Sequence, residues 1–229
     1  MIEWLLINTG LLVTAYFLGS IPTGYAIGRW FYGVDMLAEG SGSTGATNIL
    51  RTLGKLPALL VLLIDILKGT LAVILVFWTY SLSFTSEIAT HAGIQNPDLL
   101  QYWIAILAGL IVIIGHTKSI WIGWKGGKSV ASSLGILFAL DWKLALATLG
   151  IFALVLAISR IVSLSSIVGA MGIAILMIIT GEPLAYQIFA IAGGIYVIWR
   201  HRSNIERILK GTETQTRREI NYPNPIIIR

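Results

Sequence analysis

Residues 56–80 read LPALLVLLIDILKGTLAVILVFWTY, an apolar run that contains only two charged residues, Asp65 and Lys68. A helix of about 20 apolar residues crosses the hydrocarbon core of a bilayer, so this run predicts a transmembrane helix. Asp65 and Lys68 lie three positions apart and share one helical face. Unpaired charge in lipid is expensive, so we expect the two side chains to pair and to face the protein interior. A structural pair beneath a site is one interpretation, and direct contact with substrate is the other.

The rest of the chain has a similar composition. Of its 229 residues, 56% are hydrophobic and 12% are charged, whereas soluble domains carry about 25% charged residues. Further apolar runs occur at about 4–28, 100–115, 130–142, 144–159, 167–181 and 184–199. We therefore predict an all-α, polytopic integral membrane protein that forms one domain over residues 1–229. About seven transmembrane helices are expected, with five plus re-entrant segments as the fallback, because several runs are short.

Charged residues divide unequally between the two sides of this predicted topology. Seven crossings place the termini on opposite sides of the membrane. The side of the C-terminus receives Arg29, Arg51, Lys55, Lys118, Lys125, Lys128, Arg160 and the basic tail 200–229. The other side receives Glu3, Glu87, Asp98, Asp141 and Glu182, with Lys143 as its base. The positive-inside rule then predicts a cytoplasmic C-terminus and an external N-terminus.

Composition also excludes several classes of function. The chain has no cysteine, which removes disulfides, thiolate metal sites and a cysteine nucleophile. No cluster of histidines and carboxylates has the spacing of metal ligands, so we predict neither a metal nor a cofactor. The net charge of +5 follows from membrane topology and does not require a nucleic acid partner.

The first polar stretch between apolar runs is GSGSTGATNILR, residues 40–51. Glycines such as Gly42 and Gly45 allow backbone N–H groups to turn toward an anion. Ser41, Thr47 and Asn48 are neutral donors, and Arg51 offers a fork for phosphate or carboxylate; Thr44 is a further donor. The alternative is a flexible turn with a surface arginine.

The second polar stretch, residues 115–129, ends in Gly126-Gly127-Lys128-Ser129. This ending resembles a Walker A box, but Ile122 stands where that box needs glycine and no strand precedes it, so nucleotide hydrolysis is excluded. A glycine turn, a lysine and a helix that begins at Ser129 still suit a phosphate group. The alternative is an interfacial loop. We expect His116 to be a structural donor rather than a base.

The third polar region is divided between residues 160–166 and 200–213. Ser163 and Ser166 lie at the mouth of one span. On the helix that leaves the last span, residues three apart share a face, and Glu213 follows a capping Gly211. The residues on this face are His201, Asn204 and Arg207. His201 could be a general base or a hydrogen-bond donor to an anion.

In order along the chain, these motifs resemble those of the bacterial acyl-phosphate:glycerol-3-phosphate acyltransferases of the PlsY type. The resemblance implies an enzyme of the bacterial inner membrane that transfers a fatty acyl group from acyl phosphate to the 1-hydroxyl of glycerol 3-phosphate. The products would be lysophosphatidic acid and inorganic phosphate, in the first step of phospholipid synthesis. It also implies functional coupling to an enzyme that makes acyl phosphate.

Carried over by motif, the resemblance assigns catalytic or phosphate-binding roles to six positions. These are Ser41, Arg51, Lys128, Ser166 as the favoured serine of 163–166, His201 and Asn204. We expect the surrounding residues to bind substrate: Gly42, Gly45, Thr47, Asn48, Gly126, Gly127, Ser129, Ser163, Arg207 and Glu213. In this family a substrate phosphate is thought to take the hydroxyl proton.

The chain departs from the family pattern at Ser43, at Lys118-Ser119 and at Ile161. None of these departures removes a predicted anion ligand. The alternative function is a membrane transporter for a phosphorylated solute, because glycine-rich breaks and half-helix N-termini also bind anions in carriers. The polar motifs lie on one side of the predicted membrane rather than at its middle, which favours the enzyme.

Overall fold

The computed structural model describes residues 1–216, so the part of the basic tail beyond residue 216 lies outside the described residues. Over the described part the chain is helical, with one isolated antiparallel bridge between Ser119 and Lys125. The elements are α1 (Ile2–Ser20), α2 (Thr23–Tyr32), α3 (Ala46–Thr52), α4 (Lys55–Tyr80), α5 (Ser83–His91), α6 (Pro97–Thr117), the 3₁₀ turn η1 (Ile120–Ile122), α7 (Val130–Leu140), α8 (Trp142–Ser159), α9 (Val162–Ile179), α10 (Leu184–Arg200) and α11 (Arg202–Leu209). The predicted all-α fold is confirmed.

Apolar helices account for all seven predicted runs. Within residues 1–216, five helices are long and apolar enough to cross a membrane, namely α1, α4, α6, α8 and α9. The remaining two, α7 with 11 residues and α10 with 17, are apolar but shorter. The first helix ends at Ser20, two residues before Pro22, because proline disfavours helical geometry in the residue before it. The segment between α4 and α6 contains the short helix α5.

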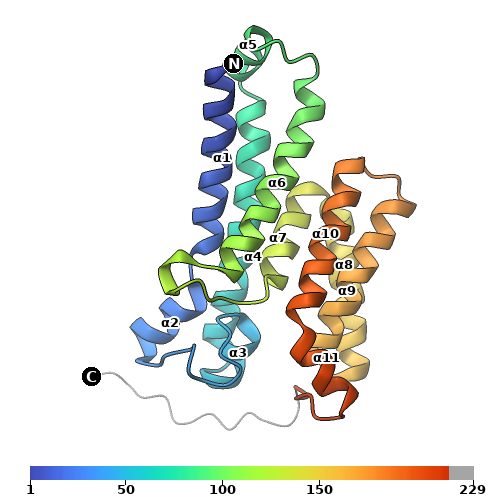
Figure 1. Cartoon of the computed structure of the whole chain (residues 1–229). Coiled ribbons are helices and arrows are strands. Elements are labelled where there is room, and N and C mark those ends of the chain that lie inside the picture. Colours follow the sequence, from blue (N-terminus) through green and yellow to red (C-terminus); the bar gives the residue numbers. More distant parts are fainter. Residues whose placement is uncertain (217–229) are drawn as a thin grey trace.

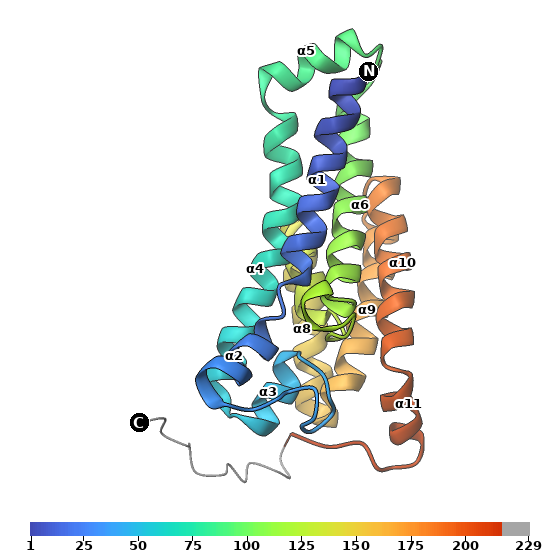
Figure 2. The same ribbon diagram turned by 60° about the vertical axis from the view of Figure 1, so that its left-hand side comes forward.

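The helices form two groups that meet along α7. In Figures 1 and 2 the long helices α1, α4 and α6 stand together, and α8, α9 and α10 form a second, shorter group. The backbones of α4 and α7 approach so closely that a Cβ on Gly69 or Gly135 would clash with a carbonyl of the other helix. Small residues at such a crossing are typical of helix packing in membranes.

The buried core lies between the two groups and contains residues such as Val73, Val112, Ile136, Met177 and Phe189. The outer faces are also apolar. Ile158 and Ile179, for example, are 78% and 75% exposed. An apolar exterior around an apolar core is the pattern of a protein solvated by lipid.

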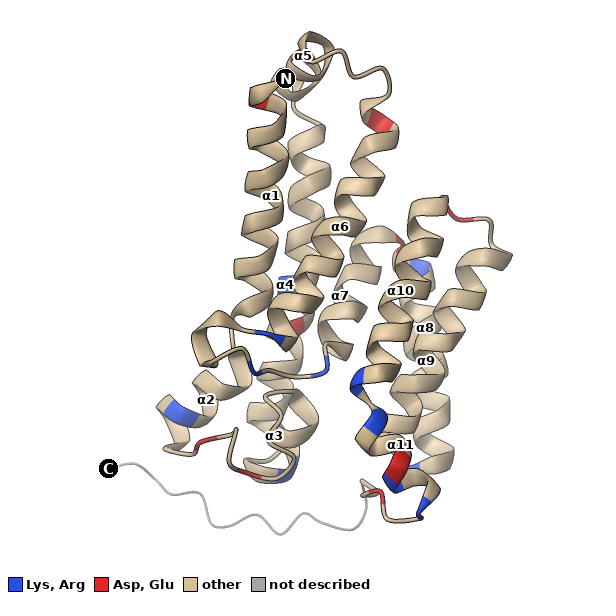
Figure 3. Cartoon of the chain, viewed as in Figure 1, with Lys and Arg blue, Asp and Glu red and all other residues tan. Residues whose placement is uncertain are grey.

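Charged residues mark the two ends of the bundle. Figure 3 shows the lysines and arginines gathered around α2, α3, α11 and the loop before α7, while the opposite end carries acidic residues at the starts of α1 and α6. The N-terminus of α1 lies at the acidic end and α11 lies at the basic end. The termini of the described chain are therefore at opposite ends, as an odd number of crossings requires.

The predicted Asp65–Lys68 pair is present and buried. The Lys68 ammonium lies 2.8 Å from the Asp65 carboxylate, and both side chains are at most 3% exposed. Thr23 donates a hydrogen bond to the same carboxylate at 3.0 Å. Lys68 also donates to the carbonyl of Ile21, the residue that follows α1. The pair therefore joins α4 to the break between α1 and α2.

Candidate active site

The first polar loop is ordered by Asn48, near the start of α3. Its side-chain oxygen accepts the Ser41 N–H at 2.9 Å, and its amide nitrogen donates to the carbonyls of Ser43 and Glu39 at 2.9 and 3.1 Å. Asn48 is buried, so these bonds satisfy its amide within the loop. The loop geometry leaves the side chains of Ser41 and Arg51 facing a cavity.

The second polar loop folds back onto the end of α6. The Ser119 hydroxyl donates to the Ser20 carbonyl at 2.5 Å, and the Gly127 N–H donates to the His116 carbonyl at 3.2 Å. Ser129, immediately before α7, has a positive φ of 61°, which turns the chain into the helix. These contacts bring Lys128 toward α11, where its ammonium donates to the Asn204 side chain.

Glu213 connects the third polar region to this lysine. Its carboxylate accepts hydrogen bonds from Ser163 at 2.8 Å, Asn204 at 2.6 Å and Arg207 at 2.7 Å. Asn204 and Arg207 share a face of α11, as their spacing predicts, and both meet this one carboxylate. The chain of contacts therefore runs from α9 and α11 through Glu213 and Asn204 to Lys128.

Burial shifts the ionisation of the polar groups at this end. Burial lowers the pKa of Lys128 to about 8, with nearby Arg207, Arg51 and Arg200 lowering it further and Glu213 opposing. Burial also opposes ionisation of Glu213, but the hydrogen bonds from Asn204, Arg207 and Ser163 outweigh it and hold its pKa below the usual value. The Glu213 carboxylate is thus charged at neutral pH, amid an excess of cations.

His201 lies at the junction of α10 and α11. Burial lowers its pKa to about 4, so the ring is neutral at pH 7. Its Nδ1 is 2.8 Å from the Val197 carbonyl, which requires the proton on Nδ1. The neutral ring then presents Nε2 as a hydrogen-bond acceptor. Donation to an anion from Nε2 would require a second proton.

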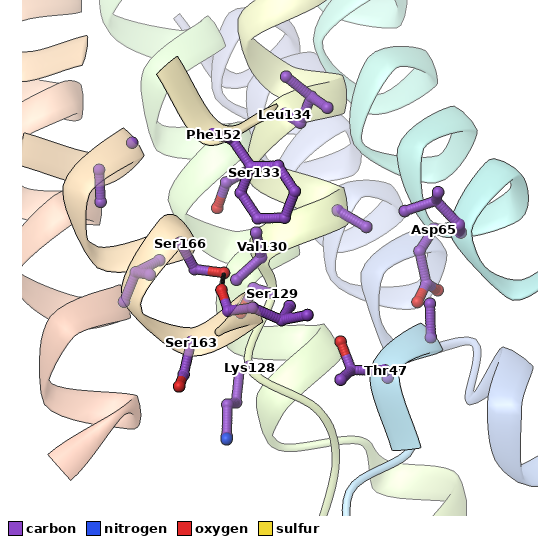
Figure 4. Close-up of a pocket in the computed structure, with 18 of the residues that line it drawn as sticks. Thr47, Asp65, Lys128, Ser129, Val130, Ser133, Leu134, Phe152, Ser163 and Ser166 are labelled. Carbon is purple, nitrogen blue, oxygen red and sulfur yellow. Dashed lines mark hydrogen bonds between the residues drawn. The ribbon is translucent and has the colours of Figure 1, made fainter. Parts of the chain in front are cut away.

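Two cavities meet at this end of the bundle. The larger, of about 790 Å³, begins at the polar loops and continues between α4, α7, α8, α9 and α10. Figure 4 shows Lys128 and Ser163 at its polar end, Phe152 and Leu134 at its apolar end and Thr47 facing in from α3. The second cavity, of about 760 Å³, is polar. Ser41, Arg51 and Lys128 line both cavities.

Most of the predicted site residues are brought together. Those that line the larger cavity are Ser41, Gly45, Thr47, Asn48, Arg51, Lys128, Ser129, Ser163, Ser166, His201, Asn204 and Glu213. Arg207 lines the polar cavity. Gly42, Gly126 and Gly127 are not among the described residues that line either cavity. These glycines shape the loop backbone.

Sequence reasoning missed several lining residues. The polar cavity also contains Glu39, Thr52, Ser203 and Thr214. The larger one contains Asp65, for which direct substrate contact was one of two interpretations, and His116, which was expected to be a structural donor. Ser203 and Thr214 are each adjacent to a predicted residue, so their proximity to a motif was the available signal. Glu39 had no such signal, because an exposed acid in a loop is common.

The fold and the site define a polytopic membrane protein with a cationic pocket beside an apolar cavity. A family model described as glycerol-3-phosphate acyltransferase matches residues 9–211. The chain is 63% identical over 209 residues to the glycerol-3-phosphate acyltransferase of Trichodesmium erythraeum (strain IMS101), covering 91% of this chain and 92% of that relative. It is 54% identical over 210 residues to the Nostoc sp. (strain PCC 7120) protein of the same description, covering 92% of both chains.

The fold also matches solved structures. The crystal structure of PlsY (YgiH), an integral membrane glycerol 3-phosphate acyltransferase, in its glycerol 3-phosphate form has a TM-score of 0.78 and 33% identity, covering 91% of this chain and 94% of that chain. The lysophosphatidic acid form of the same enzyme has a TM-score of 0.76. This chain belongs to the glycerol-3-phosphate acyltransferase family. It is a multi-pass membrane acyltransferase of the PlsY type, as its motifs predicted.

Proposed function

We propose that this enzyme transfers an acyl group from acyl phosphate to the 1-hydroxyl of glycerol 3-phosphate. The products are lysophosphatidic acid and inorganic phosphate. The observation that carries the proposal is the meeting of a polar and an apolar cavity at Ser41, Arg51 and Lys128. A glycerol phosphate fits the polar cavity and a fatty chain fits the apolar one. The related PlsY structures, described by their glycerol 3-phosphate and lysophosphatidic acid forms, support this assignment.

The chemistry needs little covalent help from the protein, because acyl phosphate is a mixed anhydride with phosphate as a good leaving group. The hydroxyl oxygen of glycerol 3-phosphate attacks the acyl carbon, and the bond from that carbon to the phosphate oxygen breaks. Both reactants are anions, so their approach is opposed by repulsion. Arg51 and Lys128 at the junction would neutralise this charge, and well-placed donors of this kind contribute on the order of 10²–10³ in rate.

The hydroxyl proton has two candidate acceptors, His201 Nε2 and a substrate phosphate oxygen. The pKa of about 4 makes His201 a weak base at neutral pH. A phosphate with a pKa near 6 is a better acceptor. We therefore assign the proton to a substrate phosphate and give His201 the role of accepting a hydrogen bond that orients the substrate.

The identity of the acyl donor is tested with purified protein and glycerol 3-phosphate. Each assay contains one acyl donor, which is synthetic acyl phosphate, acyl-CoA or acylated acyl carrier protein. Transfer is expected with acyl phosphate alone and should be lost in Arg51→Ala. Transfer that required acyl-CoA or acyl carrier protein would overturn the donor assignment.

We further propose that the basic end faces the cytoplasm of a bacterial inner membrane, as the positive-inside rule implies. The chain has no cysteine, so single cysteines report without background. Lys125→Cys and Glu87→Cys place exposed thiols at the basic and acidic ends. A membrane-impermeant thiol reagent added to intact cells should label Glu87→Cys and spare Lys125→Cys. The reverse pattern would invert the orientation.

A further inference from the structure

Both the N–H and the carbonyl of Gly127 form hydrogen bonds within the protein. Its N–H donates to the His116 carbonyl at 3.2 Å, and its carbonyl accepts a hydrogen bond from Arg200 Nη2 at 2.9 Å. His116 belongs to α6, and Arg200 is the last residue of α10. Two helices from different groups of the bundle therefore fix the peptide units that lead directly into Lys128.

The loop has little room to move at this point. A Cβ on Gly127 would clash with the His116 imidazole, so the ring already occupies the space beside the glycine. The Lys128 ammonium is in turn held by Asn204. Lys128 is thus positioned at both ends, by Gly127 through the backbone and by Asn204 through its side chain.

Arg200 makes its hydrogen bond to this machinery through the loop, and its charge also lowers the pKa of Lys128. Among the described residues it lines neither cavity. Within residues 1–216, the Gly127 carbonyl is the one hydrogen-bond acceptor of its guanidinium. A basic residue at the end of a span is ordinarily explained by membrane topology. Arg202 fits that explanation, because it is exposed and its guanidinium stacks on Trp199 at 4.8 Å.

We propose that Arg200 is a positioning residue for acyl transfer, which holds the Gly127 carbonyl and so sets where the Lys128 ammonium lies between the two cavities. The inference rests on the proposed role of Lys128 at the phosphate site. It assigns to Arg200 no contact with substrate.

The test compares Arg200→Gln with Arg202→Gln. The second variant also removes one positive charge, but at an exposed position two residues further along the chain. Because small displacements of a catalytic group are expensive, we expect kcat/KM for glycerol 3-phosphate to fall about 10- to 100-fold in Arg200→Gln. Arg202→Gln should stay within about twofold of wild type, since it touches no residue of the loop. Arg200→Lys, which keeps a donor and the charge, should lie between wild type and Arg200→Gln.

Equal kcat/KM in Arg200→Gln and Arg202→Gln would overturn the proposal, as would a change in thermal stability without a kinetic change. If Arg200→Gln does not fold, Arg200→Lys is compared with Arg202→Lys. An ammonium on a flexible stem does not reproduce the planar fork, so kcat/KM should be lower at position 200, and equal values would overturn the proposal.

All variants are assayed with whichever acyl donor the wild-type enzyme uses. A wrong donor assignment would then change the substrate of the assay, while the comparison between positions 200 and 202 would still decide the role of Arg200.

Discussion

Within residues 1–216, charged side chains cluster in the middle of the bundle and at its basic end, and the two clusters differ in their balance of charge. In the middle of the bundle, Asp65 and Lys68 form one pair at 2.8 Å, with both side chains nearly inaccessible. At the basic end, Arg207 binds the carboxylate of Glu213. Asn204 links this carboxylate to Lys128, because it donates to Glu213 and accepts from the lysine. Arg51 is also close enough to lower the pKa of Lys128.

The difference indicates what each cluster does. A one-to-one pair is neutral as a whole and has no electrostatic need for a ligand, although Asp65 also lines the larger cavity. A cluster with more cations than carboxylates is incomplete until an anion arrives, and it opens onto two cavities. The first cluster should therefore contribute mainly to stability and the second mainly to substrate binding and transfer.

The largest expected effect comes from breaking the central pair. Lys68→Met leaves the Asp65 carboxylate buried without its cation, which should lower the free energy of unfolding by about 3–5 kcal/mol. Thermal unfolding in detergent measures the loss. The exposed Glu206–Lys210 pair is the control, and Lys210→Met should cost less than about 1 kcal/mol.

The double variant Asp65→Leu/Lys68→Met sharpens this result. Removing both charges should recover much of the lost stability, because no uncompensated charge remains. If stability returns but acyl transfer does not, the pair has the direct substrate role that the sequence left open. An Lys68→Met protein as stable as wild type would contradict the structural role of the pair.

The next effect in size concerns Lys128. Lys128→Met should reduce kcat/KM for glycerol 3-phosphate by about 10²–10³, because it removes a donor at the junction of the two cavities. Thermal stability should stay near that of wild type, since burial of this ammonium is already unfavourable. Lys125→Met, at an exposed position of the same loop, is the matched control. Wild-type turnover in Lys128→Met would refute the phosphate-site assignment.

The pH dependence should follow the same lysine. With its pKa lowered to about 8, Lys128 is cationic below that pH and loses its charge above it. We expect kcat/KM to decline above about pH 8, approaching tenfold per pH unit. Arginine remains protonated throughout this range, so whatever activity Lys128→Arg retains should decline only at higher pH. If the decline of kcat/KM above pH 8 (the alkaline limb of the pH profile) is the same in Lys128→Arg, a group other than Lys128 causes that decline.

The smallest predicted effect comes from Glu213→Gln. The amide keeps an acceptor for neighbouring donors but loses the negative charge, so kcat/KM should fall several-fold, up to about tenfold. Since the Glu213 charge raises the pKa of Lys128, its removal should move the alkaline limb to lower pH. A shift to higher pH would contradict the arrangement of this cluster.

Local patterns predicted much of the fold. The apolar runs predicted seven helices, and the three-residue spacing of Asp65 and Lys68 predicted their contact. Each of these depends on neighbours within a few turns of chain. The helix α5 was not predicted, because its nine residues lack a strong apolar pattern.

The sequence predicted which residues lie in the candidate site more successfully than it predicted which of them contact one another. Asn48 was expected to bind substrate, yet its amide is engaged by the loop around it. Glu213 was expected among the ligands, and the structure makes it the acceptor that joins Ser163, Asn204 and Arg207. Which donors bind one another depends on distances between segments far apart in the chain.

The sequence alone determined that the chain is a helical membrane protein with its cationic motifs at one end, because hydropathy and charge act through the bilayer on each segment separately. Only the tertiary structure decided which charges are neutralised within the protein and which stay available to a ligand. It joined the polar loops at Lys128, opened the two cavities beside it and brought Arg200 to Gly127. Those outcomes depend on how helices pack across the bundle, where Å-scale distances determine whether a donor meets its acceptor.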